Sequence, residues 1–89
     1  MAPQDAELIA RYIEPNPHRS GPQGGRLRGY GVAVWALVAD WKGADGDAVQ
    51  VASDYEVPQE AVEAALAYYR QHQDLIDARL ALNEAAFAG

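Results

Sequence analysis

Side chains that could carry out catalysis are few and widely separated in this chain. His18 and His72 are its histidines, and neither has a second ligand at metal-binding spacing. Ser20 and Ser53 are its serines, and neither lies in the Gly-x-Ser-x-Gly pattern of a hydrolase nucleophile. The absence of cysteine excludes disulfides, thiolate metal ligands and thiol nucleophiles. The sequence therefore predicts a protein that is not an enzyme and that carries no metal or other cofactor.

The glycines do not form a phosphate-binding loop, and the carboxylates have a structural interpretation. Gly21, Gly24 and Gly25 do not lead into the Gly-Lys-Ser/Thr of a phosphate-binding loop. Acidic residues are abundant, but we expect most of them at helix starts and on polar faces. In those places they cap helices and keep the protein in solution.

Charge is distributed unevenly along the 89 residues. The formal net charge is −6, with a sum of +1 over residues 1–31 and −7 over residues 32–89. An acidic body repels a phosphate backbone. Contacts with nucleic acid are therefore expected from an assembled complex or from the front of the chain, where Arg19, Arg26 and Arg28 could clamp phosphates or enter a minor groove. The alternative for these arginines is pairing with the acidic body.

The chain divides into an irregular N-terminal part, the front, and a helical C-terminal part, and these must position the side chains named above. Residues 14–31 hold three prolines and five glycines, which disfavour a long helix, so we expect a loop there. A short strand around residues 26–32 is compatible with this pattern. Apolar residues at Leu8, Ile9, Tyr12 and Ile13 predict a short helix, with a strand across residues 11–13 as the competing interpretation.

Behind the front, the apolar residues repeat with a helical period. The stripes of two successive helices are Val34, Leu37, Val38 and Trp41, then Ala48, Val51, Ala52 and Tyr55. Gly43 is expected to end the first helix as a left-handed cap, and Asp45 or Asp47 to cap the second. Trp35 and Trp41 are expected in the core and at its edge.

A third helix is predicted to open at Pro58, only two residues after the second one ends. Its buried face is Val62, Ala65, Leu66 and Tyr69. Three helices with so tight a turn predict a trihelical helix-turn-helix core. Gln59 is the side chain of this third helix that could read an adenine, but the glutamates near it would face phosphates unfavourably. A scaffold for protein contact is as compatible with this helix as DNA binding.

The C-terminal segment carries a further apolar stripe on an appended helix. Its members are Ile76, Leu80, Asn83 and Phe87, and Leu75 and Leu82 mark a neighbouring stripe. Tyr68 cannot share a core with its neighbour Tyr69, so we expect the C-terminal helix or a partner to cover it. One interpretation folds the stripe back on its own bundle. The other makes it a helix that docks in the groove of a partner protein.

Several stretches resemble a known family. Residues 26–35 (RLRGYGVAVW) resemble the I-R-G-T-R-I-P-V-W signature of the domain-of-unknown-function family numbered 433, with Tyr30-Gly31 where the signature has Thr-Arg. Residues 51–58 (VASDYEVP) and 62–69 (VEAALAYY) are similar to the same family. Residues 76–83 (IDARLALN) are similar to tails that follow this domain in VapB-like antitoxins.

The resemblance implies a homeodomain-like fold and a role as the antitoxin of a type II toxin-antitoxin system. The partner it implies is a toxin with a PIN-type ribonuclease domain, bound and occluded by residues 75–87. Within that segment Arg79 could pair with carboxylates of the toxin. It also implies that the N-terminal domain can repress its own operon, with Arg26 and Arg28 at basic positions of the signature.

Together these observations predict a mainly α fold with three parts. Residues 1–31 form an N-terminal arm and loop, residues 32–73 the helix-turn-helix core, and residues 74–89 a partner-binding helix. The expected partners are the cognate toxin, operator DNA and a second copy of the chain, and the expected location is the cytoplasm. The alternatives are a stand-alone DNA-binding regulator and a structural homodimer without DNA binding. The candidate DNA contacts are Arg19, Arg26, Arg28 and Gln59. The candidate toxin contacts are Tyr68, Leu75, Ile76, Arg79, Leu80, Asn83 and Phe87.

Overall fold

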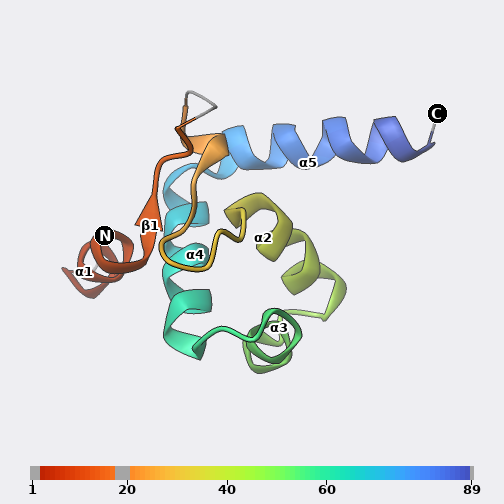
Figure 1. The fold of residues 1–89 in the computed structure, drawn as a ribbon. Coiled ribbons are helices and arrows are strands. Elements are labelled where there is room, and N and C mark those ends of the chain that lie inside the picture. The colour runs from red at the N-terminus through yellow and green to blue at the C-terminus, as the bar shows by residue number, and fades with distance from the viewer. Residues whose placement is uncertain (1–2, 18–20, 89) are drawn as a thin grey trace.

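The computed structural model describes the backbone of residues 3–17 and 21–88, and the side chains of residues 4–17 and 21–83. Within these ranges the chain is mainly helical with a small two-stranded sheet, as the sequence predicts (Figure 1). Helices α1 (Pro3–Tyr12), α2 (Val34–Gly43), α3 (Ala48–Tyr55), α4 (Gln59–Gln71) and α5 (Gln73–Ala88) form its body. Strands β1 (Ile13–Glu14) and β2 (Arg26–Leu27) and the 3-10 turn η1 (Pro22–Gly24) link α1 to α2.

The structure shows how far each of the two interpretations of residues 8–13, a helix or a strand across 11–13, is correct. The helix continues to Tyr12 and the strand begins at the next residue, so the competing helix and strand interpretations each describe part of the segment. The strands are antiparallel, with Ile13 opposite Leu27 and Glu14 opposite Arg26. Because side chains alternate across a strand, Ile13 and Leu27 both face inward and are buried. Residues 1–31 thus contribute to the same core as the helices.

That core is built from the helical stripes. Val34, Leu37 and Val38 of α2, with Val51 of α3, are at most 1% exposed. Trp35 and Trp41 are both half-buried and pack against this cluster, so both lie at the edge of the core and neither is inside it.

The turn after α2 differs from the expectation at Gly43. Gly43 is the last residue of α2 itself, and the left-handed backbone follows at Asp45, with φ 55°, and Gly46, with φ 82°. One residue, Ala44, thus separates the helix end from the reversal. Asp47 then caps α3, because its Oδ1 accepts a hydrogen bond from the amide of Gln50 at 3.1 Å.

The turn between α3 and α4 is as tight as predicted. Glu56 adopts a left-handed conformation with φ 54°, and its amide bonds back to the carbonyls of Ala52 and Ser53. Val57 is buried, and Pro58 precedes the first residue of α4. Helices α2, α3 and α4 therefore form the trihelical unit.

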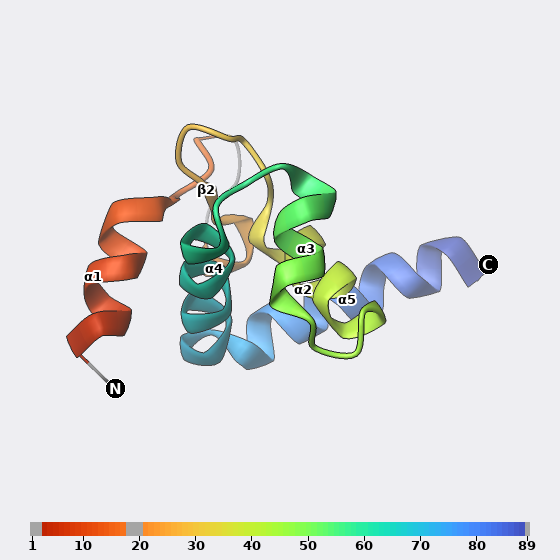
Figure 2. The same cartoon turned by 90° about the horizontal axis from the view of Figure 1, so that it is seen from below.

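Two helices extend this unit. Helix α1 lies alongside α4 in both ribbon views, and its N-terminal end is near the C-terminal end of α4 (Figures 1 and 2). Helix α5 packs against α2, η1 and α4 through its first half, and its second half projects beyond the body. Among the described residues, none of the helices has both the length and the apolar character that crossing a membrane requires.

Candidate partner-binding site

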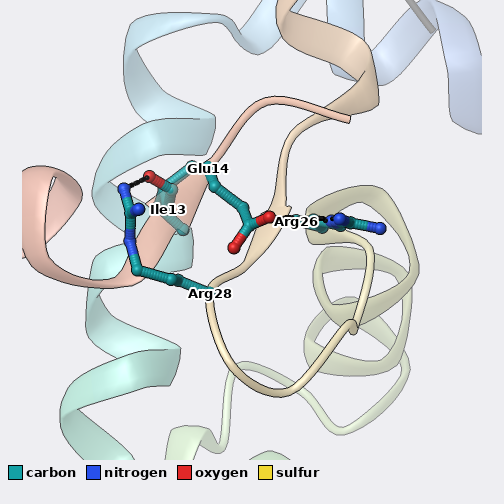
Figure 3. Close-up of polar contacts among 4 residues, drawn as sticks. All are labelled: Ile13, Glu14, Arg26 and Arg28. Atoms are coloured by element: carbon teal, nitrogen blue, oxygen red, sulfur yellow. Dashed lines mark hydrogen bonds and ion pairs between the residues drawn. The ribbon is translucent and has the colours of Figure 1, made fainter. Parts of the chain in front are cut away.

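The arginines proposed for DNA contact hold the small sheet together in this structure (Figure 3). Arg26 donates from Nε and Nη2 to Oε2 of Glu14 at 3.2 and 3.1 Å, directly across the strand pair. Arg28 donates from Nη2 to the carbonyl of Ile13 at 3.1 Å. Arg26 is thus paired within the chain, but with Glu14 of the front and not with the acidic body that was the expected alternative. Arg19 lies outside the described residues.

The outer side of α4 is covered by α1. Arg11 and Tyr12, at the end of α1, each bond to Oε1 of Glu60 at 3.0 Å. At the other end of the pair, Arg70 and Asp5 form an ion pair at 3.5 Å. A recognition helix must lay its outer side in the major groove, and here α1 occupies part of that side. Gln59 is exposed at the start of α4.

Most of the basic side chains are neutralised by carboxylates. Arg11, Arg26, Lys42 and Arg70 each form an ion pair. Among the described side chains, this leaves Arg28 and Arg79 without a carboxylate partner. Arg79 instead lies with its guanidinium carbon 5.2 Å from the ring centre of Trp35. Its charge, on α5, is therefore not compensated by a carboxylate of the described side chains.

Helix α5 is anchored to the bundle through its first turns. Ile76 is fully buried among the core residues. Next to it, Asp77 accepts hydrogen bonds from Tyr69 at 2.6 Å and from Lys42 at 3.1 Å. These bonds, from Tyr69 first and then from Lys42, lower the pKa of Asp77 by stabilising its carboxylate. Asp77 thus ties α5 to both α4 and α2.

The residues predicted to contact a toxin fall into different environments. Ile76 is inside the chain's own core and is not on the surface. Tyr68 is half-buried. We expected the C-terminal helix or a partner to cover it, but its hydroxyl contacts η1. Its hydroxyl donates to the carbonyl of Pro22 at 2.7 Å. Leu75 is 47% exposed on the first turn of α5.

The remaining members of the predicted set lie further along α5. Leu80 and Asn83 are half-buried, and together with Arg79 they are on the side of α5 that meets α2. Phe87 belongs to α5, but its side chain lies outside those described.

A groove of about 760 Å³ opens between α2 and α5. It is lined by Trp35, Ala39, Lys42, Gly43, Asp77, Leu80, Ala81 and Asn83. Ala39, Gly43 and Ala81 project little from α2 and α5. The backbone of another segment can therefore approach the groove closely. The predicted contact residues include none of those that α2 contributes to the groove. The signal for these α2 residues was the spacing of Trp35, Ala39 and Lys42, a second stripe on the helix whose other side is buried.

Two hydrogen-bond donors of α5 beside this groove have no acceptor. They are Nε of Arg79 and Nδ2 of Asn83, four residues apart, and both atoms are buried. Buried polar groups are rarely left unpaired, because they lose the hydrogen bonds that water gave them. Because both atoms are buried, they are not presented to an occupant of the groove, whose lining combines small and apolar side chains with Lys42, Asp77 and Asn83.

The acidic side chains and histidines of the described residues do not gather into a metal site. No group of three or more histidine, aspartate or glutamate side chains among them is arranged to hold a metal ion. The Asp40 and Asp54 carboxyls adjoin each other at the contact of α2 with α3. Burial, and then the neighbouring Asp54, raise the pKa of Asp40. A carboxyl pair of this kind affects stability. Burial, and then both nearby carboxylates, raise the pKa of the Tyr55 hydroxyl beside it.

Comparison of the chain with protein-family models, with curated proteins and with solved structures found no match. The resemblance to family 433 therefore stays a prediction based on the residues quoted for it.

Proposed function

We propose that this chain is a type II antitoxin, a non-catalytic cytoplasmic protein that binds and occludes a PIN-type ribonuclease toxin through α5. The observation that carries the proposal is the position of this helix. Its first half is held by Ile76 and Asp77, while its second half projects from the body (Figures 1 and 2). Leu82, on the projecting half, is 70% exposed. A firmly anchored helix with an exposed apolar side is a suitable ligand for a groove in another protein.

Charge supports the same choice of partner. A ribonuclease must attract the phosphates of RNA, so its substrate site is basic. The −7 sum over residues 32–89 favours the approach of such a surface. Arg79, which forms no ion pair with the described side chains and lies against Trp35, is the residue of α5 proposed to meet acidic side chains that a nuclease uses for metal binding.

A stand-alone DNA-binding regulator has less support. Helix α1 covers part of the outer side of α4, and Arg26 is paired with Glu14. Repression of its own operon would then rely on Arg28 in the exposed turn before α2. Such binding would weaken with salt, with a slope that reflects the few phosphates contacted.

The test uses substitutions in the projecting half, because truncation before Ile76 would remove part of the core. The full chain, as bait in a lysate of its source organism, should capture a ribonuclease and inhibit its cleavage of RNA. Leu82→Glu should weaken inhibition by about tenfold or more, because a charge replaces an apolar contact. Val49→Glu is the matched control, since Val49 is 62% exposed on α3, a different helix. Capture of no nuclease, or equal inhibition by both variants, would contradict the proposal.

A further inference from the structure

Helices α4 and α5 are joined by a single residue, His72. In Figure 1 α4 runs down the page and α5 runs across it, so the chain changes direction at this position. A break between two helices usually contains glycine or proline, because these residues end a helix. Residues 59–88 contain neither of them. The junction, with the sequence Tyr-Arg-Gln-His-Gln-Asp over residues 69–74, thus has no residue that stops a helix.

The backbone at the junction is that of an interrupted helix. His72 has φ −128° and ψ 34°, outside the helical region, while its amide still bonds back to two carbonyls of α4 at 3.2 and 3.0 Å. The helical series resumes with the bond from the amide of Ile76 to the carbonyl of His72 at 3.0 Å. The amides of residues 73–75, the first of α5, have no acceptor within that helix. One continuous helix would supply these acceptors, which are the carbonyls of residues 69–71.

Side chains distant from the junction in space or sequence hold the bend. Ile76 is fully buried against the core. Asp77 accepts one hydrogen bond from Tyr69 of α4 at 2.6 Å and another from Lys42 of α2 at 3.1 Å. We call these four residues the latch. Straightening would move Asp77 about 12 Å along the helix axis from Tyr69 and would take Ile76 out of the core.

We propose that His72 is a hinge, at which α4 and α5 exchange between the bent form and one continuous helix over residues 59–88. The straight form gains backbone hydrogen bonds for the amides of residues 73–75. It loses the burial of Ile76 and the bonds of Asp77. Because these contributions oppose each other, the two forms are close enough in free energy for a conformational switch, and the bent form predominates in the free protein.

The hinge decides how much of α5 a partner can contact. In the bent form Ile76 lies in the chain's own core, and Leu80 is half-buried on the side toward α2. In the straight form these side chains leave the body and form one exposed stripe with Asn83, because residues three and four apart share a helix face. A toxin that binds this stripe selects the straight form. This consequence rests on the proposed function, whereas the hinge itself does not.

The test measures the distance between two spin labels by pulsed electron paramagnetic resonance. The chain has no cysteine, so Glu63→Cys on α4 and Leu82→Cys on α5, both at exposed positions, create specific labelling sites. These positions are about 28 Å apart along a continuous helix, and a bend shortens the distance. Lys42→Ala weakens the latch from α2 without altering the helix propensity of α4 or α5. It should raise the fraction of the long distance several-fold, whereas Val49→Ala on α3 should not.

Two substitutions at the hinge separate straightening from a general loss of structure. His72→Ala and His72→Gly both remove the ring whose centre lies 4.6 Å from that of Tyr68. They differ in helix propensity, which favours alanine over glycine about fivefold in the interior of a helix. In the protein that also carries Lys42→Ala, the ratio of straight to bent form should therefore be about fivefold larger with alanine than with glycine.

Amide hydrogen exchange identifies the form that gives the long distance. A continuous helix protects the amides of residues 73–75, whereas a detached and frayed α5 leaves them to exchange rapidly. They should exchange more slowly with His72→Ala than with His72→Gly. A long distance that appears in none of the variants, equal ratios for the two substitutions, or equally rapid exchange of these amides would each overturn the hinge. Failure to bind a toxin would overturn the proposed function alone.

Discussion

Close contacts at single residues decide which substitutions this protein accepts. Gly25 has an ordinary backbone, with φ −57°. A Cβ at this position would nevertheless lie 2.9 Å from three atoms of Tyr68, including its hydroxyl oxygen. The Tyr68 hydroxyl is also held by the carbonyl of Pro22. The glycine is therefore required by the approach of a side chain and not by its own torsion angles.

Gly25→Ala should consequently destabilise the protein. The added methyl must displace Tyr68 and its hydrogen bond, so we expect a loss of about 1–3 kcal/mol in the free energy of unfolding. Gly43→Ala is the matched control, because a Cβ there meets nothing within 4 Å and the residue is helical. It should be neutral or stabilise by about 0.4–1 kcal/mol. Urea denaturation of both variants measures the difference, and equal effects would refute the argument.

The Asp40–Asp54 pair gives a second prediction at this scale. Because the pKa of Asp40 is raised in the folded state, the folded protein binds more protons than the unfolded chain just above the ordinary carboxyl range. Stability from this site therefore falls as the pH rises through the raised pKa.

Asp40→Asn should raise the melting temperature at pH ~7 and lose this advantage near pH ~4, where the carboxyl is protonated anyway. Glu7→Gln, which removes one negative charge from an exposed position of α1, should show no such pH-dependent gain. Thermal melts of the two variants across this pH range test the sign. A lower melting temperature for Asp40→Asn at neutral pH would contradict it.

The helices and their order could be predicted from the sequence, because each buries a stripe with the period of an α-helix. Val34, Leu37 and Val38 are an example, since they are buried as the spacing requires. The groove could not be predicted, because it depends on the angle at which α5 leaves α4 after His72. The cover on Tyr68 was missed for a similar reason: it comes from a loop 46 residues away in the chain.

Attachment of α5 to the bundle depends on few residues, of which Ile76 is the largest that is fully buried. Ile76→Ala should cost about 2–5 kcal/mol, because it leaves a cavity between α5 and the core. That is a large part of the total for 89 residues at about 0.05–0.15 kcal/mol per residue.

Leu75→Ala is the control for this prediction, as it alters the same helix one residue earlier at a side chain that is 47% exposed. It should change stability by no more than about 0.5 kcal/mol. Chemical denaturation followed by circular dichroism compares the two variants. Similar losses would mean that α5 is not anchored as described.

At the scale of the whole molecule, one small core supports a helix, α5, whose second half projects beyond the body. The radius of gyration is 12.4 Å, close to the value of about 12 Å expected for a compact chain of this length. The longest dimension is nevertheless 40 Å against 28 and 24 Å for the others. The body therefore uses its apolar residues for folding, while the projecting half of α5 remains available for a partner.

The raised pKa values of several tyrosines allow a prediction of how the stability of the protein falls at alkaline pH. Burial raises the pKa of Tyr55, Tyr68 and Tyr69, and a hydrogen bond with Glu60 is the main cause of the raised pKa of Tyr12. An acid whose pKa is raised by folding stabilises the protein below its unfolded pKa. That contribution is lost as the pH rises through the folded value.

The melting temperature should therefore fall steeply above pH ~10, where tyrosines of an unfolded chain ionise. Tyr69→Phe should make this decline shallower, because the residue is nearly buried and its hydroxyl can no longer ionise. The variant should also be less stable by about 1 kcal/mol at neutral pH, where it lacks the hydrogen bond to Asp77. Thermal melts of both proteins from pH ~7 to ~11 would show both effects. The melting temperatures of the variant and the unchanged protein should converge as the pH rises. Parallel curves for the two proteins would mean that ionisation of Tyr69 does not limit alkaline stability.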